Sequence, residues 1–285
     1  MDATFLQELL GESIATAIPL RGGDIAKAYK VLTPSNSYFV KTASYANALQ
    51  MFEAEAMGLQ YIRDTKTIAA PKVSHISFSN ATAYLIMDFV PSKAPNDKDM
   101  TRLGEALARL HNATSANGFG LTTDNYIGSL TQSNTKHPNW ADFYIHERIF
   151  PQLQMAVEAG LFPSSRIPEL KKMKSVCNAF FGTIKPSLLH GDLWSGNYLI
   201  SEQGMPYLID PAVCYGHSEM DLAMTKLFGG FSSSFYNAYH EHIPPHPNQR
   251  ELTELYQFYY LLVHLNLFGS SYFSGVQRIV QKYFL

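Results

Sequence analysis

The chain has few cysteines, little charge and no long apolar run. Only two of its 285 residues are cysteine, Cys177 and Cys214, and their apolar neighbours indicate reduced, buried thiols, although a disulfide between them stays open. The first residues lack the basic start and apolar run of a secretory signal. No stretch reaches the ~18–20 unbroken apolar residues that a membrane helix needs. We therefore expect a cytoplasmic protein without a membrane partner.

Excess positive charge is also missing. The formal net charge is −2, so the chain provides no long-range field to attract nucleic acid or an anionic membrane surface. A hydrophobic content of 46% and a charged content of 16% are typical of globular proteins. A chain of 285 residues is long enough for two lobes or one large domain.

A short polar loop between two apolar runs carries the strongest functional pattern. Within Leu188–Ile200, Asp192 precedes Asn197 by five residues, and Asp210 follows after a second apolar run. This spacing is typical of a phosphoryl-transfer loop, in which one acid orients a hydroxyl and accepts its proton. The amide and the second acid hold a divalent metal against nucleotide phosphates, and their hard oxygen atoms suit Mg²⁺. The sequence thus predicts Asp192 as the catalytic base and Asn197 and Asp210 as metal ligands.

The N-terminal third of the sequence contains a candidate cation for binding the nucleotide phosphates. Lys41 ends the alternating strand Tyr38–Lys41, where its ammonium group can point into a cleft. In the helix that follows, Glu55 lies on the apolar stripe between Leu59 and Ile62, whereas Glu53 points away from it. A buried carboxylate needs a partner, so we expect Glu55 to pair with Lys41 and fix it against the phosphates.

The order of elements predicts an α+β, two-lobed architecture. Residues 1–90 are expected to form an N-terminal nucleotide-binding lobe, an antiparallel sheet with one crossing helix, and residues 91–285 a mostly helical catalytic and substrate lobe. The first helix is expected to reach Ile14. The adjacent Gly22 and Gly23 favour a turn over the phosphates. A hinge comprising Met87, Asp88 and Phe89 would present backbone groups to the adenine edge.

The segment Leu189–Asn197, with Trp-Ser-Gly between acid and amide, resembles the fructosamine kinase (ketosamine-3-kinase) family. Asn125–Gly128, Ile209–Ala212 and Val263–Gly269 resemble it as well, and the similarity extends over essentially the whole chain. The family is related to aminoglycoside and choline phosphotransferases of protein-kinase-like fold. The resemblance implies ATP and Mg²⁺ as cofactors and phosphorylation of the 3-hydroxyl of a fructosamine or ribulosamine, free or protein-bound, as in protein deglycation repair.

Substrate contacts are expected from three residues. Trp194 offers a flat face to a sugar or a cationic amine, with packing under the loop as the alternative. His217 and Glu219 are expected either to contact substrate or to anchor the metal-binding loop. Other acceptors, namely an aminoglycoside, choline, homoserine or methylthioribose, stay open, as does a catalytically silent nucleotide-binding scaffold. The chain would act as a monomer or a homodimer.

Overall fold

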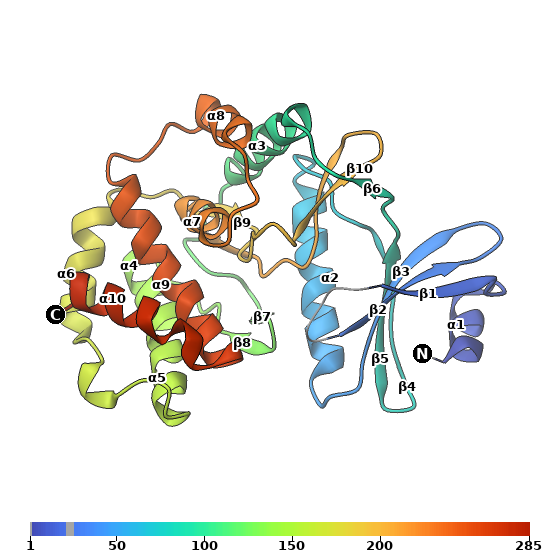
Figure 1. Ribbon diagram of the computed structural model, residues 1–285, viewed down its shortest axis with the longest axis horizontal. Coiled ribbons are helices and arrows are strands. Elements are labelled where there is room, and N and C mark those ends of the chain that lie inside the picture. The colour runs from blue at the N-terminus through green and yellow to red at the C-terminus, as the bar shows by residue number, and fades with distance from the viewer. Residues whose placement is uncertain (1, 21–25) are drawn as a thin grey trace.

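A computed structural model describes residues 2–20 and 26–285, and these form two lobes (Figure 1). The first lobe is built around a five-stranded antiparallel sheet of strand order β1-β2-β3-β5-β4. Its strands are β1 (Thr16–Leu20), β2 (Lys27–Leu32), β3 (Ser37–Ala43), β4 (Val73–Ser79) and β5 (Thr82–Asp88). Because β3 and β5 are central and carry Lys41 and Met87, the middle of the sheet supplies the side chains of the cleft.

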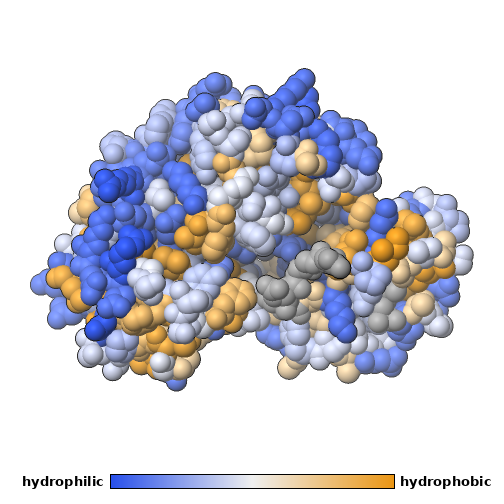
Figure 2. Space-filling view, viewed as in Figure 1, coloured by the Kyte–Doolittle hydropathy of each residue, from blue (hydrophilic) through white to orange (hydrophobic). Residues whose placement is uncertain are grey.

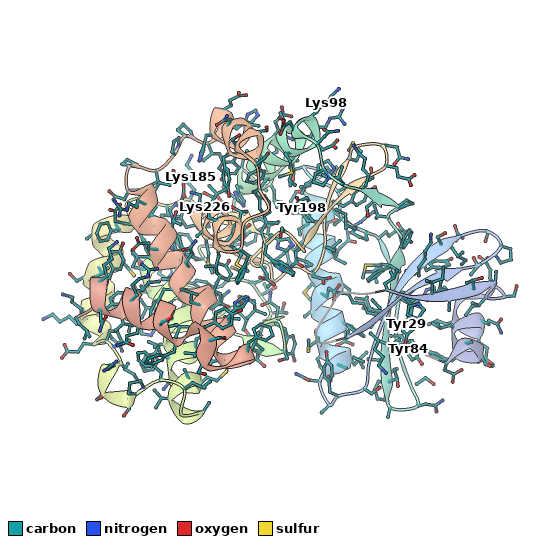
Figure 3. The ribbon with its side chains drawn as sticks, viewed as in Figure 1. Tyr29, Tyr84, Lys98, Lys185, Tyr198 and Lys226 are labelled. Atoms are coloured by element: carbon teal, nitrogen blue, oxygen red, sulfur yellow. The ribbon has the colours of Figure 1, made fainter. Side chains whose placement is uncertain are left out.

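Two helices cover the two faces of this sheet. Helix α1 (Ala3–Leu10) buries Leu6 against the face where Tyr84 and Tyr29 lie (Figure 3). The side chain of Asp2 caps its N-terminus by accepting a hydrogen bond from the Phe5 amide at 3.1 Å. The expectation that this helix reaches Ile14 is wrong, because Gly11 adopts a left-handed conformation with φ of 66° and ends it.

Helix α2 (Ala48–Asp64) packs on the opposite face, toward the second lobe (Figure 1). Phe52, Leu59 and Ile62 are buried on the stripe that the sequence predicts. Gly58 approaches the second lobe so closely that an added Cβ atom would lie 2.9 Å from the Cγ atom of Pro211. Helix α2 is therefore packed directly against the residue that follows Asp210.

The chain enters the second lobe after β5. Strand β6 (Ser92–Lys93) pairs with β10 (Tyr198–Ser201), which pairs with β11 (Pro206–Leu208). Helix α3 (Asp97–His111) then starts with a capping box formed by Asn96 and Asp99.

The rest of the second lobe is mainly helical, with two further strand pairs. These are β7 (Asn125–Ile127) with β8 (Leu130–Gln132), and β9 (Ser187–Leu189) with β12 (Cys214–Gly216). The helices are α4 (Trp140–Phe143), a π-helical turn (Tyr144–Ile149), α5 (Phe150–Glu158), a 3₁₀ turn (Ser164–Arg166), α6 (Leu170–Phe181), α7 (Glu219–Leu227), α8 (Ser233–His242), α9 (Gln249–Phe268), a 3₁₀ turn (Ser270–Tyr272) and α10 (Phe273–Tyr283).

Helix α9 lies at the centre of this lobe and contacts α5, α6, α7 and α10. Leu255, Tyr256, Phe258 and Leu262 are among its fully buried residues, which explains why its sequence is apolar on more than one face. Within the described part of the chain, no helix has both the length and the apolar character needed to span a membrane. The predicted α+β, two-lobed fold class is confirmed.

Candidate active site

A cavity of about 980 Å³ lies between the lobes, where the molecular surface is hollowed (Figure 2). Side chains from β3, α2 and β5 form its N-terminal wall. The loops around Asp192 and Asp210 form the opposite wall, together with the ends of α7 and α9. The cavity thus brings Lys41, Glu55, Asp192, Asn197 and Asp210 to one place, although up to 169 residues separate them in the sequence.

Lys41 contacts carboxylates of both lobes. Its Nζ atom donates to both carboxylate oxygens of Glu55, at 2.8 and 2.9 Å, and also to Oδ1 of Asp210. Burial alone would lower the pKa of Lys41, but the two carboxylates outweigh burial and raise it, so the ammonium stays charged. Burial would likewise raise the pKa of Asp210, and the nearby ammonium lowers it instead. The Asp210 side chain is 42% exposed toward the cavity and remains an accessible carboxylate.

Asp192 lies on the loop between β9 and β10. Its backbone amide donates to Nδ1 of His190 at 3.2 Å, and Nε2 of His190 donates to the Ile209 carbonyl at 2.9 Å. Burial lowers the pKa of His190, which keeps the imidazole neutral in the tautomer that this arrangement requires. Burial, and then the charges of Asp210 and Asp221, raise the pKa of Asp192 to about 7. A carboxylate with that pKa is suited to accept a proton near neutral pH.

Asp221, at the start of α7, supports the same loop from beneath. Its fully buried carboxylate accepts from the amides of His190 and Gly191, at 2.7 and 2.9 Å, and from Nε2 of His111 at 3.1 Å. Burial would raise the pKa of Asp221, and these hydrogen bonds lower it. Gly191 must be glycine, because its φ is +87° and a Cβ atom would lie 2.0 Å from the Ala212 carbonyl oxygen. The turn before Asp192 is therefore fixed by contacts that are distant in sequence.

Asn197 and Asp210 are arranged to present oxygen atoms. The amide nitrogen of Asn197 donates to the carbonyl oxygen of Asp192 at 2.8 Å, and no described residue donates to its Oδ1 atom. Asp210 has a φ of +54°, a conformation that few non-glycine residues adopt and that recurs at functional sites. One amide oxygen and one exposed carboxylate fit the hard ligands of a divalent cation that nucleotide oxygens and water complete.

The segment after β5, which the sequence predicts as the hinge, lines an apolar part of the cavity. Met87 is buried at the end of β5, and Asp88 and Phe89 also line the cavity. The amides of Asp88 and Phe89 already donate to the carbonyls of Lys72 and Ser37. No acceptor for the amide of Val90 is found among the described residues, and Val90 lines the cavity as well. Gly22 and Gly23 lie outside the described residues.

Aromatic side chains contribute to the cavity wall of the second lobe, beside the two loops. The ring of Trp194 is 40% exposed and lies over Gly196, where an added Cβ atom would come within 2.3 Å of it. An aromatic cluster faces the same space and consists of Phe228, His264, Phe268 and Tyr272, with ring centroids of contacting pairs 4.8–6.3 Å apart. Sequence reasoning missed this cluster, although His264 and Phe268 are four residues apart on α9 and share a helix face.

His217 and Glu219 do not line the cavity. His217 is buried, and its Nδ1 atom accepts from the Tyr256 hydroxyl at 2.7 Å, while burial lowers its pKa to about 3. Glu219 is also buried, and burial raises its pKa. His217 precedes α7 and Glu219 begins it, and both side chains lie in the lobe interior.

Comparison with known proteins places the chain in a family. The family model described as fructosamine kinase matches residues 2–285. A protein of Lactiplantibacillus plantarum named "Probable ketoamine kinase" is 38% identical over 283 residues, covering 98% of each chain. The chloroplastic protein-ribulosamine 3-kinase of Oryza sativa subsp. japonica is 36% identical over 286 residues, covering 97% of this chain and 82% of the rice protein.

Solved structures agree with this placement. The crystal structure of a candidate fructosamine-3-kinase from Thermobifida fusca is 31% identical, with a TM-score of 0.85 over 98% of this chain and 96% of the other. Aminoglycoside phosphotransferase APH(4)-Ia, in a complex with ADP and hygromycin B, shares the fold with a TM-score of 0.65 at 16% identity, covering 98% of this chain and 97% of the other. The resemblance drawn from the Trp-Ser-Gly loop is confirmed, and the chain belongs to the fructosamine kinase family.

Proposed function

We propose that this protein transfers the γ-phosphoryl group of ATP to a sugar hydroxyl of a ketosamine, the 3-hydroxyl of a fructosamine or ribulosamine. The observation that carries the proposal is the convergence of Lys41 and Glu55 with Asp192, Asn197 and Asp210 around one cavity. The names of the ketoamine and ribulosamine kinases at 36–38% identity support the same acceptor class.

The nucleotide would lie between the lobes, with its base in the apolar slot formed by Ala28, Met87 and Leu199. The free amide of Val90 would donate to the adenine edge. Lys41 would contact the phosphates, because its hydrogen bonds to Glu55 hold the ammonium group in the cavity.

Asn197 and Asp210 would hold magnesium, which neutralises charge on the phosphate oxygens. Asp192 would accept the proton of the acceptor hydroxyl and orient its oxygen toward the γ-phosphorus. The hydrogen bond from Asn197 and the His190 contact fix the loop that carries this carboxylate. Catalysis then rests mainly on positioning and on electrostatic stabilisation of the transferred group.

The acceptor would bind between Asp192 and the aromatic side chains. Trp194 offers a ring face to a sugar or its amine, and the aromatic cluster provides an apolar surface for the group that carries the amine. Burial lowers the pKa of His264, which keeps this surface uncharged.

The proposal is tested with ATP, magnesium and a panel of acceptors. We expect turnover of fructosyl-lysine or ribulosyl-lysine, with the phosphate found on the 3-hydroxyl by NMR, and loss of turnover in Asp192→Asn with ATP binding retained. Strong turnover of an aminoglycoside or choline, with none of either ketosamine, would show that a ketosamine is not the acceptor. Undiminished activity of Asp192→Asn would show that Asp192 is not the catalytic base.

A further inference from the structure

A second cavity, of about 510 Å³, lies outside the cleft. It is formed where the C-terminal end of α2 and the loop after it meet α3 and the β10–β11 turn, near the top of the molecule in Figure 1. It shares no lining residue with the cavity that contains Lys41 and Asp192. The elements around it come from both lobes, which are joined here by the hydrogen bond from the Leu208 amide to the Ala69 carbonyl at 2.9 Å.

The charge in this cavity differs from that of the whole chain. Four cationic side chains line it, Arg63, Lys66, Arg102 and Arg109, against the single carboxylate of Glu105. The whole chain has a formal net charge of −2, so the positive excess is local. A concave site lined by one sign of charge concentrates ligands of the opposite sign.

Two of the guanidinium groups are held in place by the backbone. Nη1 of Arg63 donates to the Ala70 carbonyl at 2.8 Å, and Nη1 of Arg102 donates to the Gly204 carbonyl at 3.1 Å. Each of these bonds uses one of the five N–H donors of an arginine, so most donors remain for a ligand. Holding the groups in advance reduces the entropy that a ligand must overcome when it orders them.

The other two cations are weakly compensated. Arg109 lies 3.9 Å from Glu105, and both side chains are more than a third exposed, so this pair contributes little. No ion pair is found for Lys66 among the residues that the structure describes. Outside the lining, Asp99 pairs with Lys93 and partly compensates Arg102. A bound anion would mainly relieve the repulsion that involves Lys66 and Arg109.

The remaining lining is apolar. Ile68, Ala70, Ala106 and Pro206 contribute, and Met205 is a large apolar residue that is 53% exposed. Arginine side chains next to apolar groups suit a ligand with a phosphate at one end and carbon at the other. A volume of about 510 Å³ falls in the range of small-molecule sites.

We propose that this cavity binds a small phosphorylated compound through Arg63, Lys66, Arg102 and Arg109. The bound phosphate would contact α2 and the loop after it on one side and α3 on the other. It would therefore join the two lobes at a place separate from the nucleotide. Since α2 also carries Glu55, the ligand would stabilise the lobe arrangement in which Glu55 reaches Lys41.

Direct binding tests the proposal without any need for turnover. Pyrophosphate, in metal-free buffer, is titrated by calorimetry into the wild type, into Lys41→Met and into Lys66→Gln/Arg109→Gln. The last pair is chosen because both side chains are exposed and, unlike Arg63 and Arg102, donate to no backbone carbonyl among the described contacts. We expect one site that persists in Lys41→Met and is weakened at least about tenfold in the double variant.

The matched control is Lys171→Gln/Lys172→Gln, which removes the same charge from an exposed face of α6. Equal weakening in this control, or unchanged affinity in Lys66→Gln/Arg109→Gln, would overturn the proposal, as would binding that disappears in Lys41→Met alone. Orthophosphate and glucose 6-phosphate distinguish the source of the ligand. Tighter binding of the ester supports a phosphorylated metabolite, and equal binding supports free phosphate. Failure of the kinase assay would leave this result unaffected.

Discussion

Asp221→Asn should damage both stability and turnover, although Asp221 touches no substrate. In the native protein its carboxylate accepts from two backbone amides and from His111, all in the lobe interior. Asparagine keeps one acceptor oxygen but replaces the other by an NH₂ group. At least one of the native donors then faces this NH₂ group and loses its acceptor. A hydrogen bond to a charged group contributes about 1.5–3 kcal/mol, and an unsatisfied buried donor costs about 1–3 kcal/mol.

We therefore expect the free energy of unfolding to fall by about 2–4 kcal/mol. For a chain of 285 residues that corresponds to roughly 3–7 °C in the melting temperature, which calorimetry measures. Because the native pKa of Asp221 lies below that of an unfolded aspartate, its stabilisation is present above about pH 4 and is lost as the pH falls toward the native pKa. The difference between wild type and variant should shrink in acid.

Turnover should fall as well, because the amides of His190 and Gly191 position the loop that carries Asp192. A displacement of about 1 Å at a reacting group costs on the order of 100-fold in rate. We expect kcat to fall by about that factor with the KM for ATP changed less than about threefold, since Asp221 does not line the cavity that would hold the nucleotide. The matched control is Asp64→Asn, an exposed carboxylate at the end of α2, which should melt like the wild type. A variant that melts within about 1 °C of the wild type and keeps its kcat would refute the reasoning.

Three further predictions concern the cleft. Lys41→Met should lower kcat/KM for ATP by roughly 100- to 1,000-fold in steady-state assays, because it removes the cation held at the phosphates, and near-normal kinetics would contradict that role. In a pH profile, kcat/KM should fall on the acid side with unit slope, because Asp192 must be deprotonated to act as a base. A bound cation lowers the pKa of Asp192 from about 7, so the midpoint of this acid limb should lie at or below pH 7. A rate that rises below pH 6 would exclude Asp192 as the base. Gly196→Ala should displace the Trp194 ring and raise the KM for the acceptor by about 3- to 30-fold with ATP binding unchanged, as acceptor-dependent kinetics would show, and an unaltered KM would argue against stacking.

The sequence predicts the parts of the site that follow from local periodicity. Only Glu55 lies on the buried stripe of its helix, whereas Glu53 points away from it, and in the structure Lys41 contacts Glu55. The loop from Asp192 to Asn197 is short, so its spacing already limits how far apart the two side chains can lie. Alternation along β3 likewise fixes the face on which Lys41 emerges.

Contacts between distant segments could not be predicted in this way. Asp221 reaches back 30 residues to Gly191 and 110 residues to His111, and no local pattern encodes that approach. The aromatic cluster combines the end of α7 with α9 and the turn after it, so its members become neighbours only when the helices pack. The burial of His217 and Glu219 also could not be predicted from local sequence. It depends on how α7 and α9 pack, as in the hydrogen bond between His217 and Tyr256.

The close approach of Gly58 to Pro211 limits where helix α2 can lie. Because Gly58 lies against Pro211, α2 has no room to move further toward the second lobe, and Lys41 links its Glu55 to Asp210 across the cleft. Any larger residue at position 58 would push the helix and its glutamate away from the lysine. The structure thus already contains the paired glutamate and lysine, with α2 seated against the second lobe.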